Sequence, residues 1–237
     1  MELTVLLPVW NEAKNLTLLL PELKRVADKL AVTYEILVVD GGSSDGSPDV
    51  AKRNGVQLTT QTRAGYGGAL HAGFSAAQGE YILTMDADYS HPPEFVEELF
   101  QRRKEFDLLI ASRYIPGGSA EMSRARLLLS RCLNAVYRTV LRLPYRDLST
   151  GFRLYRQAAL HQIEFHSEKF DVLPEILVRL YAGGYRIAET PFHYRQRKSG
   201  RSHARLIPFG WAFLQTLFRM WRLRQSVGSR HLLTRRS

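Results

Sequence analysis

Three short apolar runs, separated by helix-like stretches, constrain the fold of this chain more than any other feature of its sequence. They cover residues 3–9 (LTVLLPV), 34–40 (YEILVVD) and 80–86 (EYILTMD), and each is nearly continuous in hydrophobicity. Runs of this kind are typical of strands that are buried on both faces of a parallel sheet. Because helical periodicity fills the stretches between them, we expect right-handed crossovers and a mainly parallel sheet covered by helices on both sides.

The rest of the chain extends this pattern. Helices are predicted over residues 11–30, 47–54, 68–78, 94–104 and 124–141, and further strands over residues 106–112 and 186–194. The chain has 237 residues, 45% of them apolar, and no internal repeat, so it can bury one large core. We therefore expect one globular catalytic-type domain over residues 1–205 and a tail over residues 206–237.

Positive charge is concentrated in the C-terminal part. The net charge is +10, the last acidic residue is Glu189, and residues 190–237 hold 11 of the 33 Lys and Arg residues. Residues 206–218 carry no charge, but this run is shorter than the roughly 20 residues that a membrane-spanning helix needs. We expect the tail to lie in a membrane interface beside anionic headgroups. The alternatives are a terminal helix docked on the core and a nucleic-acid contact, but no nucleic-acid-binding motif accompanies the tail.

The single cysteine and the N-terminus bear on the compartment. Cys132 has no partner for an intramolecular disulfide, which fits a reducing compartment, and we expect it to be a small buried apolar residue. The first apolar run follows Glu2 directly, with neither a basic segment nor a small-residue cleavage site, so we expect no secretory signal. The predicted location is cytoplasmic, peripherally associated with the cytoplasmic face of a membrane.

Two carboxylates follow the third apolar run. Ligands of open parallel sheets bind beyond the carboxyl ends of the strands. Asp86 and Asp88 are two residues apart, so at the end of a strand they would face the same side, about 6.6 Å apart, and repel each other. A divalent cation removes this conflict, because Mg²⁺ and Mn²⁺ prefer oxygen ligands and usually take one or two carboxylates together with substrate phosphates. The alternative is a solvated turn that caps the next helix.

The segment after the second run, residues 40–46 (DGGSSDG), is a second candidate ligand site. It matches neither a dinucleotide-binding fingerprint nor a phosphate-binding P-loop. Asp40 could accept hydrogen bonds from a base or ribose, and the glycines after it permit close approach of the backbone. Alternatively, the segment is only a glycine-rich turn into a helix, with Asp45 or Ser47 as the N-cap.

Taken together, the motifs resemble a known family. The sequence contains PVWNE at residues 8–12, VVDGGSSDGS at 38–47 and MDAD at 85–88, in the order and spacing of the inverting family 2 glycosyltransferases of GT-A fold. Three further features resemble the polyprenyl-phosphate mannosyltransferases within that family: ASRYIPGG at 111–118, DLSTGFRLYR at 147–156, and Arg197 followed by Gly200 and Ser202. The resemblance extends to about residue 205.

This resemblance implies a fold and a set of site residues. The implied fold is a three-layer α/β/α sandwich with a mainly parallel central sheet, and the implied cofactor is Mg²⁺ or Mn²⁺. Residues implied in binding the nucleotide sugar are Pro8, Trp10, Glu12, Asp40, Asp86 and Ala87. Those implied in holding the metal are Asp86, Asp88 and Ser90, and those implied in holding the acceptor phosphate are Arg113, Arg126, Ser130 and Arg197. Asp88 and Arg113 are the implied catalytic residues.

The sequence departs from the family pattern at several positions. A second aspartate often follows the position of Asp40, where this chain has Gly41, and Trp10 and His203 stand where tyrosine and lysine are usual. Glu175 resembles a family glutamate on a helix that faces the site, although a solvent-exposed carboxylate is an equal alternative. Asp147 is a candidate general base, with capping or pairing to Arg153 as the alternative.

The predicted reaction is transfer of a hexosyl group, most simply mannosyl from GDP-mannose, to a polyprenyl phosphate with inversion. UDP-hexose is the alternative donor. A phosphate monoester has a second pKa near 6 and arrives ionised, so it needs no strong base, whereas a hydroxyl acceptor would need one. Expected partners are the donor, the acceptor, a membrane surface and a small membrane subunit. Two other functions remain open: transfer to a hydroxyl of a glycan or lipid, and non-catalytic binding of a nucleotide or membrane.

Overall fold

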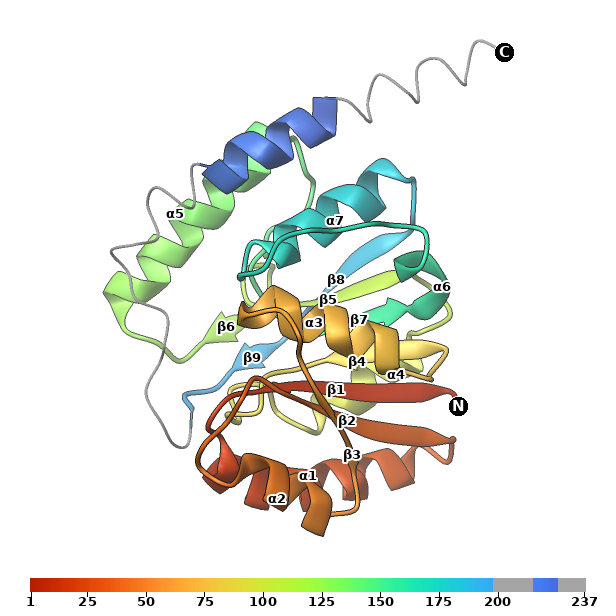
Figure 1. The fold of residues 1–237 in the computed structure, drawn as a ribbon. Coiled ribbons are helices and arrows are strands. Elements are labelled where there is room, and N and C mark those ends of the chain that lie inside the picture. Colours follow the sequence, from red (N-terminus) through yellow and green to blue (C-terminus); the bar gives the residue numbers. More distant parts are fainter. Residues whose placement is uncertain (198–214, 226–237) are drawn as a thin grey trace.

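A seven-stranded sheet forms the centre of the molecule (Figure 1). The structure, a computed structural model, describes residues 1–197 and 215–225. In the order β3-β2-β1-β4-β7-β5-β8, the strands are Gln57–Thr60, Tyr34–Asp40, Leu3–Val9, Tyr81–Thr84, Arg153–Arg156, Leu108–Ser112 and Ile187–Pro191. Only β7 runs antiparallel to its neighbours, β4 and β5. The predicted mainly parallel sheet is therefore confirmed.

Helices cover both faces of the sheet, which confirms the three-layer sandwich (Figure 1). One face carries α1 (Ala13–Lys29), α2 (Ser47–Arg53) and α4 (Phe95–Gln101). The other carries α3 (Gly65–Ala76), α5 (Arg124–Leu141), α6 (Gln157–Leu160), α7 (Val172–Ala182) and a helical segment at residues 215–225. Side chains of the central strands alternate between the two cores: Leu3, Val5 and Leu7 enter one, and Leu6 enters the other. This double burial explains the continuous apolar runs.

The third predicted strand is shorter than its apolar run. β4 ends at Thr84, so Asp86 and Asp88 lie in the following loop and not in the strand. The chain turns sharply there, because Tyr89 adopts a positive φ of 67°, a conformation that non-glycine residues rarely take. The expected strand geometry, with both carboxylates on one face, is therefore wrong, although both still lie beyond the end of the strand.

Other expectations also change. Cys132 lies exposed on α5, so the expected burial is wrong. The sequence analysis did not predict β3, β7, α6 or β6 (Ser119–Ala120). The strand predicted over residues 186–194 is divided into β8 and β9 (His193–Tyr194), and β9 forms a small parallel pair with β6. That pair matters for the site, because the chain after β9 runs past the loop after β4, where Arg195 N donates to the Ser90 carbonyl at 3.0 Å. Among the described residues, no helix is long and apolar enough to span a membrane.

Candidate active site

The loops after β1 and β2 are joined by hydrogen bonds at the carboxyl edge of the sheet. Asn11 N donates to Ser43 Oγ at 2.9 Å, and Ser44 N donates to Asn11 Oδ1 at 2.8 Å. The Asp45 carboxylate accepts from Ala13 N, at the start of α1, at 2.9 Å. The loop after β2 turns into α2 as expected, but the N-cap residue of α2 is Gly46, so the predicted cap at Asp45 or Ser47 is wrong. The two loops form one rigid rim.

The residues implied in nucleoside binding lie on this rim. Asp40 is buried, and its carboxylate accepts from the N–H groups of Gly42 and Ser43 at 2.9 and 3.1 Å. Trp10 directly follows β1 and exposes 49% of its surface. Pro8 is half-buried in β1. The contacts of Asp40 close the turn of its own loop, and its role in binding a nucleoside stays a prediction.

Asp86 stands beside a buried histidine that the sequence analysis did not single out. Asp86 N donates to His91 Nδ1 at 2.9 Å, which leaves the proton of a neutral ring on Nε2, 3.7 Å from Asp86 Oδ2. Burial lowers the pKa of His91 to about 3, so the ring is neutral. The ring stacks on Phe152 at 4.7 Å. The sequence signal was its place directly after the acidic motif, but a lone histidine is usually structural.

Asp88 contacts both its own loop and Arg197. It is buried, its Oδ1 accepts from Ser90 N at 3.0 Å, and its Oδ2 lies 2.7 Å from Arg197 Nη2. Loss of hydration, followed by the charge of Asp88, raises the pKa of Asp86. Burial and then the charge of Asp88 also raise the pKa of Glu12, partly offset by its hydrogen bond with Asn15. Three carboxylates and one guanidinium therefore share this corner.

Arg113 forms the other charged centre, and its partner is Asp147. Arg113 Nε and Nη2 lie 2.7 and 2.8 Å from the two carboxylate oxygens, and Arg113 N also donates to Asp147 at 3.1 Å. Burial alone would raise the pKa of Asp147, but the charge and hydrogen bonds of Arg113 outweigh it and hold the pKa below its ordinary value. The expected pairing with Arg153 is wrong, because the Arg153 guanidinium donates to three backbone carbonyls, those of Leu148, Thr150 and Leu173.

Two tyrosines connect this pair to the residues implied in holding the acceptor phosphate. The Tyr114 hydroxyl donates to Ser130 Oγ at 2.6 Å, and the Arg113 guanidinium lies over the rings of Tyr114 and Tyr194. Burial, and then the charges of Asp88 and Asp86, raise the pKa of Tyr194, whereas Arg126 lowers it. Through these two tyrosines Arg113 is linked to Ser130 and to the charges of Arg126 and Asp88, and Asp88 in turn pairs with Arg197. Neither tyrosine was singled out from the sequence.

The remaining residues named from the sequence are Ala87, Ser90, Glu175 and His203. Ala87 and Ser90 are buried within the loop, and the role of Ser90 as a metal ligand stays a prediction. Glu175 is buried, so the exposed alternative is wrong; it accepts hydrogen bonds from the N–H groups of His166 and Ser167 and pairs with Arg179. His203 lies outside the described residues.

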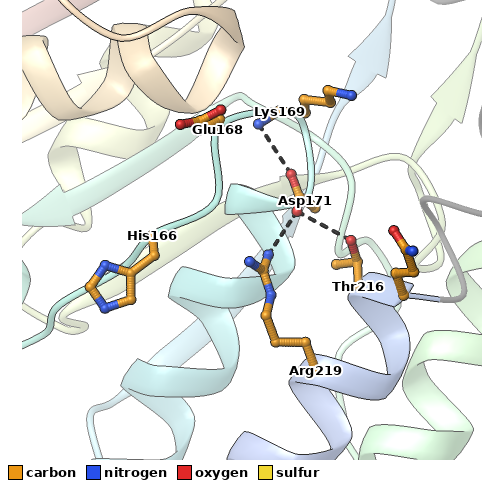
Figure 2. Close-up of a pocket in the computed structure, with 7 residues that line it drawn as sticks. His166, Glu168, Lys169, Asp171, Thr216 and Arg219 are labelled. Carbon is orange, nitrogen blue, oxygen red and sulfur yellow. Dashed lines mark hydrogen bonds and ion pairs between the residues drawn. The ribbon is translucent and has the colours of Figure 1, made fainter.

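A pocket of about 330 Å³ is lined by none of the residues predicted to form the site (Figure 2). It is formed where the loop before α7 meets the helical segment 215–225, and its lining residues are His166, Glu168, Lys169, Asp171, Gln215, Thr216 and Arg219. Asp171 accepts from Lys169 N at 3.1 Å and from Thr216 Oγ1 at 3.1 Å, and pairs with Arg219 at 2.8 Å. These contacts attach the segment to α7, so we assign the pocket a structural role.

The arrangement at the sheet edge suits charged ligands of both signs. Asp86 and Asp88 offer oxygen ligands of the kind that Mg²⁺ and Mn²⁺ prefer. Within residues 1–197 and 215–225, no cluster of three or more His, Cys, Asp or Glu side chains is arranged to enclose a metal, so water and phosphate oxygens would complete any coordination shell. Arg113, Arg126 and Arg197 supply guanidinium groups suited to a phosphate.

Comparison with known proteins places the chain in a family. The model of the family described as glycosyl transferase family 2 matches residues 4–164. The chain belongs to glycosyl transferase family 2. The match covers β1 to α6 and therefore includes the loops after β1, β2 and β4 and the Arg113–Asp147 pair.

Individual relatives refine this result. The chain is 30% identical over 217 residues to a dolichol-phosphate mannosyltransferase of Pyrococcus furiosus, covering 85% of this chain and 59% of the relative. It is also 30% identical over 200 residues to a dolichyl-phosphate hexose transferase of Haloferax volcanii, covering 83% of this chain and 84% of the relative. The chain thus spans only part of the Pyrococcus protein.

A solved structure agrees on the fold. Glucosyl-3-phosphoglycerate synthase from Mycobacterium tuberculosis, in complex with Mn²⁺, UDP and phosphoglyceric acid, superposes with a TM-score of 0.73. The two chains are 22% identical, and the match covers 93% of this chain and 78% of the other. This likeness shows the GT-A fold, and the complex shows divalent metal and nucleotide bound to a protein of that fold.

Proposed function

We propose that this protein transfers a hexosyl group from a nucleotide sugar to a polyprenyl phosphate, with mannosyl from GDP-mannose as the first donor to test. The observation that carries the proposal is the 2.7 Å contact between Asp88 and Arg197. Asp88 belongs to a group of carboxylates suited to a cation and a diphosphate, and Arg197 belongs to a group of arginines suited to a second phosphate. The two relatives named for dolichyl-phosphate transfer support the same acceptor class.

Asp86 and Asp88 fit a divalent cation. They supply oxygen donors from one loop, and the protein itself places a guanidinium against Asp88, so this position accepts positive charge. Bound Mg²⁺ or Mn²⁺ would neutralise the charge that develops on the leaving diphosphate. Trp10, with Pro8, Glu12 and Asp40 on the adjoining rim, would hold the nucleoside.

The acceptor would be held by Arg113, Arg126, Ser130 and Arg197. Its phosphate is ionised near neutral pH, so its oxygen attacks the anomeric carbon without a general base. As this bond forms, the bond from the anomeric carbon to the diphosphate oxygen breaks, the electron pair leaves with the nucleoside diphosphate, and the anomeric configuration inverts. Asp147 does not serve as the base in this scheme, because both of its oxygens are engaged by Arg113.

The test is direct transfer. The full chain is incubated with Mg²⁺ or Mn²⁺, a panel of labelled nucleotide sugars and a short polyprenyl phosphate, and label that becomes organic-extractable and acid-labile is counted. We expect one donor to be used, Asp88→Asn to lose at least 100-fold in rate, and the matched prenol, which lacks the phosphate, to accept no label. If no donor labels the prenyl phosphate, the proposed acceptor is wrong, and labelling of the prenol would favour the hydroxyl-acceptor alternative.

The proposed place of the reaction is the cytoplasmic face of a membrane, where a polyprenyl phosphate is anchored. The described part of the chain has no helix that could cross a membrane, so contact with the bilayer would come from the tail, from a small membrane subunit, or from a surface of the domain.

A further inference from the structure

Helix α5 exposes a strip of apolar side chains opposite the side that it buries. Its buried residues are Asn134, Tyr137 and Leu141. The exposed fractions are 65% at Leu128, 41% at Leu129, 44% at Val136 and 40% at Val140. Steps of four residues rotate by only about 40° around a helix, so Leu128, Cys132, Val136 and Val140 form one slanting strip. Single exposed apolar residues are ordinary, but a continuous strip of them indicates a contact surface.

The helical segment at residues 215–225 continues this apolar surface. It buries Leu217 and Met220 in the same core cluster that holds Tyr137 and Leu141 of α5, so both helices turn their exposed rows away from one shared core. Phe218 and Trp221 are 59% and 40% exposed, and their rings stack at 5.9 Å.

Several contacts hold this segment beside α5. Thr216 hydrogen-bonds with Tyr137 of α5, and Arg219 pairs with Asp171 at the start of α7 (Figure 2). The two helices lie side by side at the outer edge of the molecule (Figure 1). The outer face is defined as Leu128, Leu129, Val136, Val140, Phe218 and Trp221.

The charged residues of the two helices that form the outer face are all positive. Residues 124–142 and 215–225 contain no Asp or Glu. Arg124, Arg131, Arg138 and Arg142 are exposed and lie along one side of the α5 strip at helical spacing. Arg222 is exposed on the second helix. Apolar side chains flanked by arginines match the interface of an anionic bilayer, in which acyl chains take up the apolar groups and headgroups pair with the cations.

We infer that the outer face, built jointly from α5 and residues 215–225, docks this protein on an anionic lipid surface. A second copy of the chain fits less well, because two such faces would bring their arginine rows together without a single described carboxylate between them. Docking also orients the site, since Ser130 and Arg126 lie on the first turns of the same α5. This orientation rests on the proposed function, but the docking does not.

The test uses the full chain and sedimentation with vesicles of phosphatidylcholine, with or without phosphatidylglycerol. The double variant Leu128→Glu and Val136→Glu places two negative charges on exposed positions of the outer face. We expect its partition onto phosphatidylglycerol vesicles to fall at least tenfold, since each charge near such a surface is worth about fivefold and apolar burial is also lost. Circular dichroism and urea unfolding should match the parent chain, because both positions are exposed.

Leu18→Glu is the matched control. Leu18 is 58% exposed on α1, which covers the opposite face of the sheet, so its substitution should leave vesicle binding unchanged. Equal loss in Leu18→Glu, or no loss in the double variant, would overturn the inference. The inference would also be overturned if the parent chain did not bind the vesicles and instead formed a dimer that only the double variant disrupted. The occupant of the outer face would then be a second copy of the chain.

A separate measurement keeps this result apart from the proposed function. Transfer to a water-soluble short-chain prenyl phosphate without vesicles needs no docking, so the double variant should retain the rate of the parent chain. If the parent chain docks but transfers to no prenyl phosphate, the proposed function fails while the docking surface stands. If transfer occurs but docking does not depend on Leu128 and Val136, the docking surface fails alone.

Discussion

Asp147 holds the acceptor side of the site together. It is completely buried, and besides Arg113 its carboxylate accepts from Thr150 N at 3.1 Å. Asp147→Asn leaves the buried Arg113 charge without its counter-ion, so we expect the free energy of unfolding to fall by about 3–5 kcal/mol. Urea unfolding measures this, and Ser149→Ala, which removes only a hydroxyl beside the pair, should cost about 1 kcal/mol. A general base would behave differently: its asparagine variant would lose transfer and keep its stability.

The same pair predicts a dependence of stability on pH. Because the folded pKa of Asp147 lies below its ordinary value, the ion pair contributes fully above the unfolded pKa of about 3.9 and is lost as the pH falls through the folded pKa. The difference in unfolding free energy between the parent chain and Asp147→Asn should therefore be constant near neutral pH and shrink below about pH 4. A difference that stays constant into the acid range would contradict this assignment.

We expect Arg197 and a divalent cation to compete for Asp88. Removing the guanidinium, 2.7 Å from Asp88 Oδ2, removes a positive charge from the predicted metal position. At about 1 kcal/mol for two charges 4 Å apart in water, Arg197→Gln should bind Mn²⁺ about fivefold more tightly in the absence of nucleotide. The paramagnetic resonance signal of free Mn²⁺ measures this.

Arg195→Gln is the matched control for this prediction. Arg195 lies two residues earlier in the chain and pairs with Glu94 at 3.7 Å, so its loss should leave Mn²⁺ affinity unchanged. Arg197→Gln should also raise the KM for the prenyl phosphate. Weaker Mn²⁺ binding in Arg197→Gln would show that the guanidinium supports the cation and does not displace it.

Among the elements, the long buried strands β1 and β2 could be predicted and β7 could not. Burial on both faces gives β1 and β2 continuous apolar runs, which a sequence reveals directly. β7 has only four residues and begins with Arg153, which is fully buried because three backbone carbonyls accept from its guanidinium. Those carbonyls come together only in the folded chain. No local pattern predicts a strand that begins with a buried arginine.

In the candidate site, too, some features could be predicted from the sequence and others could not. The positions of Asp86 and Asp88 beyond a strand end followed from the sequence, but their turn did not, because it depends on the positive φ of Tyr89. The Arg113–Asp147 pair was missed, since the two residues are 34 positions apart and meet only through the packing of β5 against the loop before β7. Family resemblance named both residues without joining them.

Helix α3 packs so closely on the loop before α7 that one methyl group should disturb it. A Cβ at Gly67 would lie 2.0 Å from the Ser167 carbonyl, and backbone cannot yield as a side chain can. We expect Gly67→Ala to lower the free energy of unfolding by about 1–3 kcal/mol, despite the better helix propensity of alanine. Ser75→Ala, at an exposed position of the same helix, should change it by less than about 0.5 kcal/mol in urea unfolding. Equal effects of the two variants would contradict this close packing.

In the whole molecule, the described part of the tail has features of both a docked terminal helix and an interfacial segment. Of residues 206–237, only 215–225 are described, so the expected interfacial segment otherwise lies outside the structure. Within 215–225, Leu217 and Met220 enter the core, as a docked terminal helix would require, whereas Phe218 and Trp221 face outward. The helix is therefore docked on the domain and still presents an apolar surface. The sequence could not predict α5 as its partner, because exposed and buried apolar residues look alike in a helical pattern.

The distribution of charge over the molecule, and not its net value, should govern binding to an anionic surface. Arg124→Gln with Arg138→Gln removes two charges beside the outer face, whereas Arg25→Gln with Arg53→Gln removes two exposed charges from α1 and α2 on the opposite side of the sheet. Both double variants lower the net charge equally. At about 1 kcal/mol for each arginine near the surface, the first should weaken partition onto phosphatidylglycerol vesicles about thirtyfold, and the second should leave it within about twofold.

Salt separates the two contributions to that binding. Raising the ionic strength screens the arginine–headgroup attraction but leaves apolar insertion intact, so the parent chain and the Arg124, Arg138 variant should converge at high salt. The Leu128, Val136 variant should remain weaker than the parent chain under the same conditions. If both pairs of arginine substitutions weakened binding equally, net charge alone would explain it, and the molecule would have no preferred face toward the membrane.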